Sequence, residues 1–183
     1  MTSASLKRLG LGWTGSAFTF PMQDGLGRVR GIRRRFPNGK QCAVKGSKNG
    51  IFVPTNLRHT GLLLVCEGAS DTAALLDLGF EALGRPDCQS ARKGVLRHVR
   101  KKRPKAVVVV ADNDQPGRKG AWSLARALTL HCRHVRVITP PESIKDAREW
   151  KRQGATRADV DAIILHSPEL TLLARPHRIG GRR

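Results

Sequence analysis

Hydrophobic residues follow two different patterns along the chain, and the change between them comes near residue 60. Between residues 17 and 54, short apolar stretches alternate with turn signals, among which Asp24-Gly25 and Asn38-Gly39 tolerate the positive φ angles of hairpin turns. This part of the chain predicts a small antiparallel sheet. The strands predicted in it are AFTFPM, RVRGIRRRF, QCAVKG and GIFVP.

After residue 60 the pattern predicts alternating strands and helices. The segments LLLVC, AVVVVA and HVRVI predict buried strands, and SDTAALLDLGF, SARKGVLRHVRKKRP and GRKGAWSLARALTLH predict helices. Apolar strands joined by crossover helices belong to a parallel sheet covered on both faces. We therefore predict an α/β fold in three parts: a basic N-terminal β module (1–58), a Rossmann-like domain with a parallel sheet flanked by helices (61–152), and a C-terminal helix followed by a disordered basic tail (153–183).

The charge of the chain changes the range of partners to consider. The chain has 34 Lys and Arg residues and 14 Asp and Glu residues, so its formal charge is +20. Residues 1–60 contain eleven of the basic residues and a single acidic residue, Asp24. A surplus of this size favours nucleic acid as a partner, because each neutralised phosphate releases counterions. The alternatives for the overall charge are a basic surface kept for solubility and a ribosome-associated protein. The alternative for the arginine-rich strand is an edge strand whose arginines only discourage aggregation. The strand residues predicted to contact phosphate are Arg28, Arg30, Arg33, Arg34 and Arg35.

Several classes of protein are excluded by what the sequence lacks. The longest apolar run, 106–111, is far shorter than the roughly 20 residues of a membrane span, and glycines interrupt any apolar region of a signal peptide. We therefore expect an intracellular protein with no membrane partner. The four cysteines form no CxxC half-site, so a zinc ribbon is not predicted, and Cys66 and Cys132 are expected to be buried apolar residues.

Acidic residues follow two of the predicted strands. Glu67 ends LLLVC, and Asp112 and Asp114 follow AVVVV, where the carboxyl ends of parallel strands bind ligands. Residues two apart in an extended chain point the same way, so the two aspartates can converge. Carboxylates gathered at about 4 Å repel by roughly 4 kcal/mol per pair at an effective dielectric near 20, so a cation is predicted. Ligands that are all oxygen favour Mg²⁺ or Mn²⁺, which suit phosphate chemistry.

The order of these motifs resembles the Toprim domain of primases, topoisomerases and related nucleases. The motifs are the strand ending in Glu67-Gly68, then Asp71, AVVVVADND, PGR and IKDAREW, over about residues 61–152. The resemblance implies that Glu67, Asp112 and Asp114 bind divalent metal, with Glu67 as a general acid or base. It also implies that Asp71 organises the site, and simple capping of a helix is the alternative for this residue.

IKDAREW resembles the element that ends Toprim units in phage-type primase-helicases. This resemblance implies that Asp146 is a further acid facing the metal, and an N-cap is the alternative. Ala147-Arg148-Glu149 departs from the pattern of that element, which puts a role for Glu149 in doubt.

The N-terminal part is similar to the basic segment that precedes Toprim in phage and bacterial primases, through its FPM, GIRRR, KGS and GIFVP stretches. The resemblance implies that Lys45 and Lys48 contact nucleotide or template. Arg118 and Lys119 begin a predicted helix, where a phosphate also meets free backbone N–H groups, so they are predicted substrate clamps. No P-loop motif occurs, and the zinc ribbon of complete primases is missing, so we expect a minimal core or a fragment.

The sequence therefore predicts a primase-like, divalent-metal-dependent nucleotidyltransferase that makes short RNA primers on single-stranded DNA during DNA replication. Nucleotides and a replicative helicase are the further expected partners, in the cytoplasm of a bacterium or of a phage-infected cell. Two alternatives stay open, a nuclease of the Toprim superfamily and a nucleic-acid-binding accessory module without catalysis.

Overall fold

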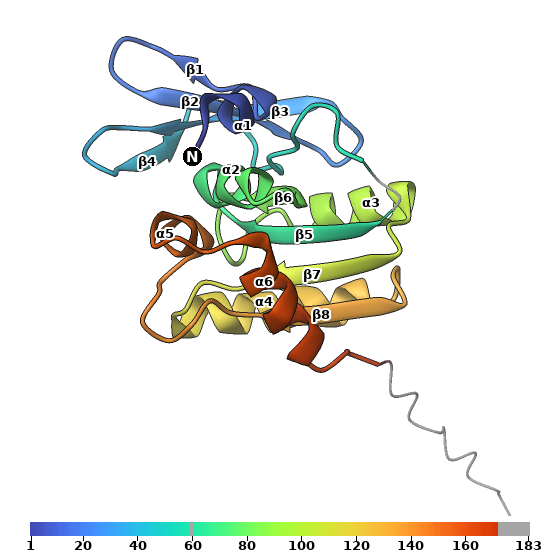
Figure 1. The fold of residues 1–183 in the computed structure, drawn as a ribbon. Helices are drawn as coiled ribbons and strands as arrows, with labels where there is room; N and C mark the ends of the chain where they lie inside the picture. The colour runs from blue at the N-terminus through green and yellow to red at the C-terminus, as the bar shows by residue number, and fades with distance from the viewer. Residues whose placement is uncertain (59–60, 172–183) are drawn as a thin grey trace, which may run out of the picture.

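Two four-stranded sheets form the frame of the computed structural model, which describes residues 1–58 and 61–171 (Figure 1). The N-terminal sheet is antiparallel, with the order β1-β2-β3-β4, and the second sheet is parallel, with the order β6-β5-β7-β8. The predicted α/β architecture with a preceding antiparallel sheet is confirmed. The strands are β1 (Gly12–Trp13), β2 (Phe18–Gln23), β3 (Val29–Arg35), β4 (Gln41–Ala43), β5 (Leu62–Glu67), β6 (Glu81–Arg85), β7 (Ala106–Val110) and β8 (His134–Ile138).

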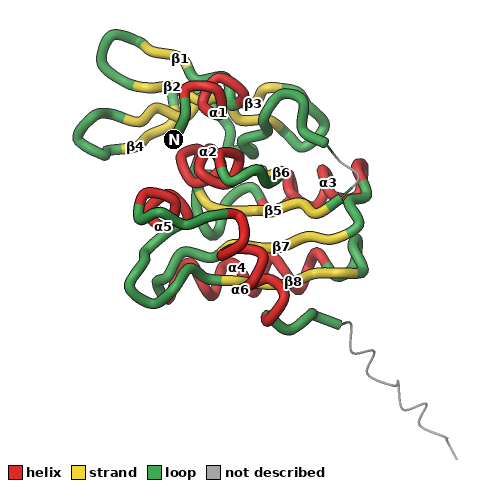
Figure 2. The backbone as a smooth tube through the Cα atoms, in the orientation of Figure 1, coloured by secondary structure: helices red, strands yellow, loops and turns green. Residues whose placement is uncertain are grey.

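Helices cover both faces of the parallel sheet (Figure 2). Successive side chains of a strand point to opposite faces. Leu64 and Val108 therefore pack with α2, α5 and α6, whereas Val65 and Val109 pack with α3 and α4. The helices are α1 (Ser3–Arg8), α2 (Ala69–Asp77), α3 (Arg92–Lys102), α4 (Gln115–Leu128), α5 (Ala147–Arg152) and α6 (Arg157–His166).

The segment at Ile51 and Phe52 joins the two sheets. It was predicted as a strand, but it forms only isolated bridges, Ile51 with Gln23 of β2 and Phe52 with Gly84 of β6. Each bridge carries a reciprocal pair of backbone hydrogen bonds of 2.8–3.0 Å. Phe52 is also part of the same buried cluster as Leu64, so the antiparallel sheet and the parallel sheet share one hydrophobic core.

Among the elements that the sequence did not predict are β1, β6 and α1. The strand β6 reads EALGR, which is neither a long apolar run nor strictly alternating, although four of its five residues are buried. The helix α1 precedes the antiparallel sheet, and Thr2 caps it by accepting a hydrogen bond from the Ser5 N–H (3.2 Å). The expected disordered tail lies outside the described residues, which end at residue 171.

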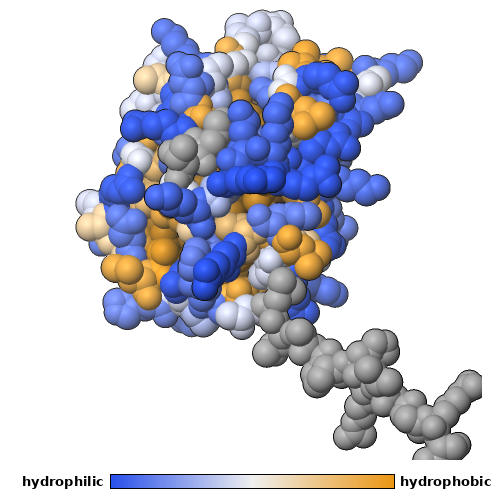
Figure 3. All heavy atoms as spheres, turned by 90° about the vertical axis from the view of Figure 1, so that its right-hand side faces the viewer, coloured by the Kyte–Doolittle hydropathy of each residue, from blue (hydrophilic) through white to orange (hydrophobic). Residues whose placement is uncertain are grey.

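The amino ends of the parallel strands lie at the edge that faces the viewer in Figure 3. This face is mostly hydrophilic, with separate apolar patches, and the last turn of α3 adds Arg100, Lys101 and Lys102. Cys66 and Cys132 are buried, as predicted. Within residues 1–58 and 61–171, no helix is both long and apolar enough to span a membrane.

Candidate active site

The predicted acids meet at the carboxyl edge of the parallel sheet. The strands β5 and β7 are direct neighbours, with Val65 beside Val109, so Glu67 and Asp112 end adjacent strands. Asp71 lies in the first turn of α2, and Asp146 directly precedes α5, which packs against α2. The topology therefore brings together acids that are up to 79 residues apart in the sequence.

Burial and mutual repulsion disturb the titration of these acids. Burial, followed by the charges of Glu67, Asp146 and Asp114, raises the pKa of Asp112 to about 7. Burial also raises the pKa of Asp71 to about 7, with the charge of Asp146 as the next cause. The pKa of Glu67 is raised by burial and lowered by the nearby Arg85. The cluster holds more negative charge than its surroundings neutralise, which is the condition that a bound cation relieves.

Two of the acids offer oxygens that accept no hydrogen bond, although Arg85 Nη2 lies 3.8 Å from Glu67 Oε1. Glu67 Oε1 is buried and accepts no hydrogen bond, and no described residue donates a hydrogen bond to the Asp112 carboxylate. These oxygen donors fit a hard divalent ion such as Mg²⁺ or Mn²⁺. In the part of the chain that the structure describes, no three His, Cys, Asp or Glu side chains already stand at metal-ligand spacing. The donor chemistry thus fits the predicted metal, while the ligand geometry is not formed.

Asp114 and Asp146 have local structural tasks as well. Asp114 caps α4, because its Oδ1 accepts a hydrogen bond from the Gly117 N–H (2.7 Å). Asp146 caps α5 by accepting from the Glu149 N–H (2.7 Å), and Glu149 in turn accepts from the Lys145 N–H (3.2 Å). Each aspartate keeps its second oxygen outside the cap. Capping therefore holds both carboxylates in place at the sheet edge.

Asp71 does not cap its helix. The N-cap of α2 is Gly68, which supplies no side-chain hydrogen bond, whereas Asp71 is buried and accepts a hydrogen bond from the backbone N–H of Arg148 (3.0 Å). The Arg148 guanidinium also pairs with Asp146 Oδ2, with 3.2 Å between Nη2 and that oxygen. Arg148 therefore ties α5 to α2 and supplies a cation to the acids. In the sequence, Arg148 is notable only because it departs from the motif.

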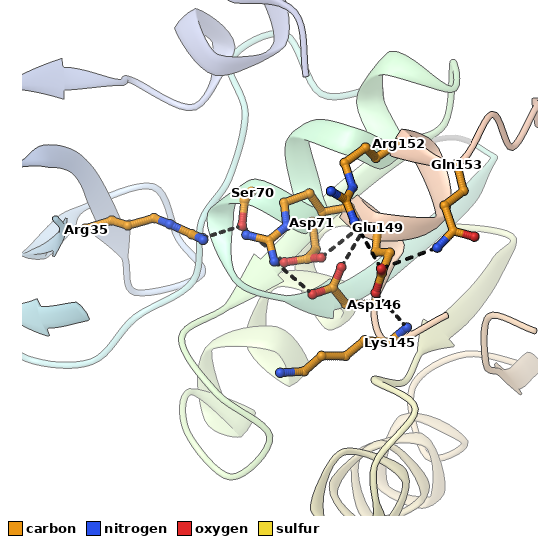
Figure 4. Close-up of polar contacts among 9 residues, drawn as sticks. Arg35, Ser70, Asp71, Lys145, Asp146, Glu149, Arg152 and Gln153 are labelled. Carbon is orange, nitrogen blue, oxygen red and sulfur yellow. Dashed lines mark hydrogen bonds and ion pairs between the residues drawn. The ribbon is translucent and has the colours of Figure 1, made fainter. Parts of the chain in front are cut away.

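Arg35 connects the antiparallel sheet to the same cluster. Its Nη1 donates a hydrogen bond to Ser70 Oγ (2.8 Å), and Ser70 in turn donates to Asp71 (3.2 Å; Figure 4). Burial lowers the pKa of the Arg35 guanidinium, while Asp71 and Asp146 act in the opposite direction. One residue predicted to contact nucleic acid thus lies within reach of the acids.

The arginines of β3 do not share one face. Arg33 and Arg35 alternate with Arg34, so they lie on the side of Phe20 and Met22, which faces the buried core. Arg30 and Arg34 lie on the opposite side, where Arg34 covers the Phe36 ring at 5.7 Å from its centroid. The other predicted contacts are placed as follows: Arg28 pairs with Asp24 in the turn before β3, Lys45 and Lys48 are exposed after β4, Arg118 donates to Asn113 (2.7 Å), and Lys119 is exposed on α4.

An exposed aromatic pair lies on the Arg35 side of the antiparallel sheet. Trp13 of β1 and Phe18 of β2 are paired residues whose ring centroids are 4.8 Å apart, and Phe18 pairs across with Arg35. Trp13 is 53% exposed and Phe18 is 41% exposed. The face of the sheet that reaches the acids therefore also carries two aromatic rings open to solvent.

Arg85 is a site residue that the sequence did not reveal. It is 2% exposed and stands beside Glu67 in the register of β5 and β6, with 3.8 Å between its Nη2 and Glu67 Oε1. Its Nη1 donates a hydrogen bond to the Cys88 carbonyl (2.6 Å). Arg85 could be placed next to Glu67 only if β6 had been predicted as a strand.

Raising the pH from 5 to 8 is expected to destabilise the metal-free protein. Asp71 and Asp112 have a pKa near 7 when folded and 3.8 when unfolded, so the folded state binds more protons between these values and stability falls as the pH rises. Urea unfolding in EDTA measures this slope. Asp71→Asn should make the free energy of unfolding depend less on pH. Asp161→Asn, on α6, should leave this pH dependence unchanged. An unchanged pH dependence for Asp71→Asn would contradict the raised pKa of Asp71.

The chain resembles known proteins in its fold, although its sequence alone finds no match. No family model and no curated protein matches the sequence. A parallel sheet with acids at the ends of β5 and β7, preceded by an antiparallel sheet, is a Toprim-type α/β fold, which the chain shares with the catalytic core of DnaG. The resemblance inferred from the motifs is confirmed at the level of the fold.

Solved structures of primase catalytic domains share this fold. A structure of the bacteriophage T7 lagging-strand DNA polymerase interacting with primase domains matches with a TM-score of 0.72 and 17% identity, over 93% of this chain and 89% of that chain. The primase catalytic core of E. coli matches with a TM-score of 0.60 and 20% identity, over 91% and 60%. The Aquifex aeolicus primase matches with a TM-score of 0.65 and 20% identity, over 90% and 46%. The chain thus spans about three fifths of the E. coli core.

Proposed function

We propose that this chain is a primase-like nucleotidyltransferase that uses a divalent metal to synthesise short RNA primers on single-stranded DNA. The observation that carries the proposal is that Glu67 Oε1 and the Asp112 carboxylate accept no hydrogen bond from any described residue, at a sheet edge that Arg35 of the basic sheet also reaches. Glu67, Asp112 and Asp114 would hold Mg²⁺ or Mn²⁺, with Asp146 beside them. Such an ion would supply positive charge that stabilises the charge developing on phosphate oxygens.

The residues around the ion have separate tasks in this proposal. Burial raises the pKa of Glu67, which brings the carboxylate closer to the range in which it can accept a proton from a hydroxyl group. Asp71 and Arg148 fix α2 and α5 against each other, so they position the acids. Arg35, with the exposed Lys45, Lys48, Arg118 and Lys119, would neutralise phosphates of template and nucleotide.

The structural relatives support the proposed partners. The T7 primase domains are bound to an RNA/DNA hybrid and dTTP, and a DnaG primase catalytic domain is bound to single-stranded DNA. We extend these ligands to this chain as single-stranded DNA and nucleotides. A further match is the primase fragment of the T7 primase-helicase protein, at 17% identity and a TM-score of 0.66, which supports a replicative helicase as a partner.

One reaction tests the proposal. End-labelled single-stranded DNA and differently labelled ribonucleotides are incubated with the protein and Mg²⁺ or Mn²⁺, and both labels are followed on one gel. Short ribonucleotide products that require the metal would support primer synthesis. Shortened DNA without ribonucleotide incorporation would identify a nuclease instead.

A binding module without catalysis is the second candidate, because a specific feature favours it. Arg148 already pairs with Asp146 and bonds Asp71, and no described group of acids has metal-ligand spacing. Under this alternative, neither label changes, while the DNA is still retained by the protein at low salt.

Replacing Trp13 with alanine is expected to weaken binding of single-stranded DNA by about 5-fold to 100-fold, because base stacking on an aromatic ring contributes ~1–3 kcal/mol. Fluorescence anisotropy of a labelled oligo(dT) at fixed low salt measures the change. Trp122→Ala is the matched control, since Trp122 is 41% exposed on α4, away from the antiparallel sheet. Equal losses in the two variants would argue against stacking on the Trp13–Phe18 pair.

A further inference from the structure

A cavity of about 510 Å³ lies on the α3 and α4 side of the parallel sheet, next to the acids but outside the cluster that they form. Its size is within the range of small-molecule sites, about 300–1,000 Å³. The loop after β6 and the first half of α4 form its walls, and they pack closely, since a Cβ added at Gly120 would lie 2.5 Å from the Cys88 carbonyl oxygen. The lining includes Arg85, Cys88, Arg92 and Lys119.

The lining of this cavity is cationic. Arg85, Arg92 and Lys119 contribute three positive charges, and no Asp or Glu is among the lining residues. Arg92 and Lys119 are exposed at the rim, whereas Arg85 is 2% exposed. Arginine presents its N–H groups in a fixed planar fork that matches phosphate oxygens, so this lining favours a phosphate over an uncharged ligand.

Arg85 has hydrogen-bonding capacity that the protein does not use. Its Nη1 donates to the Cys88 carbonyl and its Nη2 lies 3.8 Å from Glu67 Oε1, but its buried Nε has no hydrogen-bond partner. A buried donor without a partner destabilises the folded state, and an anion in the cavity would supply the acceptor. This side chain is the observation that points to a ligand.

The start of α3 adds to the same wall. Its N-cap is Ala91, which has a φ of 58° and provides no side-chain hydrogen bond to the first turn, so the N–H groups of this 11-residue helix are not capped by a side chain. Arg92, the first helical residue, lines the cavity. The start of α4 differs, because Asp114 caps it. The uncapped helix end favours an anion near Arg92.

We propose that this cavity binds a phosphate group, supplied either by the polyphosphate of a free nucleotide or by the backbone of a bound strand. Arg85 links it to the candidate active site through Glu67, so an anion in the cavity would share this arginine with the acid. The use of the bound phosphate in primer synthesis rests on the proposed function. The binding itself does not.

Cys88 provides a direct readout, because it lines the cavity and Cys66 and Cys132 are buried. In a Cys42→Ser background, the rate of alkylation of Cys88 is measured against rising inorganic triphosphate, and separately against an oligo(dT) without terminal phosphates. Three proteins are compared: the background, R92A/K119A, and the matched control R97A/R126A. The control removes the same charge from exposed positions of α3 and α4 that do not line the cavity.

Triphosphate is expected to slow alkylation, with a half-saturating concentration about tenfold higher in R92A/K119A and unchanged in R97A/R126A. Protection by triphosphate alone assigns the nucleotide as the source, and protection by oligo(dT) assigns the strand. The proposal is overturned if neither probe slows alkylation, or if both double variants respond alike. Protection without any primer product from the unsubstituted protein would leave the cavity assigned and reject primer synthesis.

Discussion

Replacing Asp112 with asparagine is expected to lower templated incorporation of ribonucleotides by about 10³-fold, which corresponds to ~4 kcal/mol of lost transition-state stabilisation. Asparagine has nearly the same shape but lacks the charge, and among the described residues none donates a hydrogen bond to the Asp112 carboxylate or forms an ion pair with it. The measurement is the initial rate of primer synthesis on single-stranded DNA with Mg²⁺ or Mn²⁺.

The matched control for this variant is Asp161→Asn. Asp161 lies on α6 and pairs with Arg157, away from the sheet edge, so its loss should leave the rate of synthesis unchanged. Binding of single-stranded DNA by Asp112→Asn should be retained or tighter, since removing a carboxylate removes repulsion of phosphate. Full activity in Asp112→Asn would contradict the proposed role, and a parallel loss of DNA binding would indicate damage to the fold.

The acids of the candidate site could be predicted because their signals are local. The strands β5 and β7 are built on apolar runs. Glu67 is the last residue of β5, and Asp112 follows β7 after one alanine, at the end where ligands bind in parallel sheets. Glu67 and Asp112 come together only if β5 and β7 are neighbours in the sheet. The two strands are neighbours, with Leu62 beside Ala106. Short-range patterns were sufficient for these residues.

The cations beside the acids could not be predicted, because they depend on tertiary contacts. Arg85 belongs to β6, whose sequence EALGR lacks the apolar run of a buried strand. Arg35 approaches Ser70 only because the antiparallel sheet packs against α2, a contact across 35 residues that no spacing rule contains. Arg148 acts through its backbone N–H as well as its side chain. Residues of this kind become visible only when the sheets are placed relative to each other.

The boundary between the N-terminal module and the Toprim-type domain also depends on tertiary packing. The change of pattern near residue 60 predicts two separate parts, yet Phe20 and Met22 of the antiparallel sheet lie in one buried cluster with Leu64 and Leu75. Phe52 is 2% exposed in that cluster, and its ring meets Phe20 edge-on at 6.3 Å between centroids. A shared core of this kind couples the stability of both sheets.

Phe52→Ala is therefore expected to destabilise the whole protein by about 3–5 kcal/mol, the typical cost of removing a buried aromatic ring. Urea unfolding is followed by fluorescence in two single-tryptophan variants, one keeping Trp13 in β1 and one keeping Trp150, a buried residue of α5. Both midpoints should fall together. Val29→Ala, at a position 61% exposed on β3, should move neither. If only the Trp13 signal shifts, the two sheets unfold independently, and Arg35 then holds its place beside the acids through the Ser70 contact rather than through a common core.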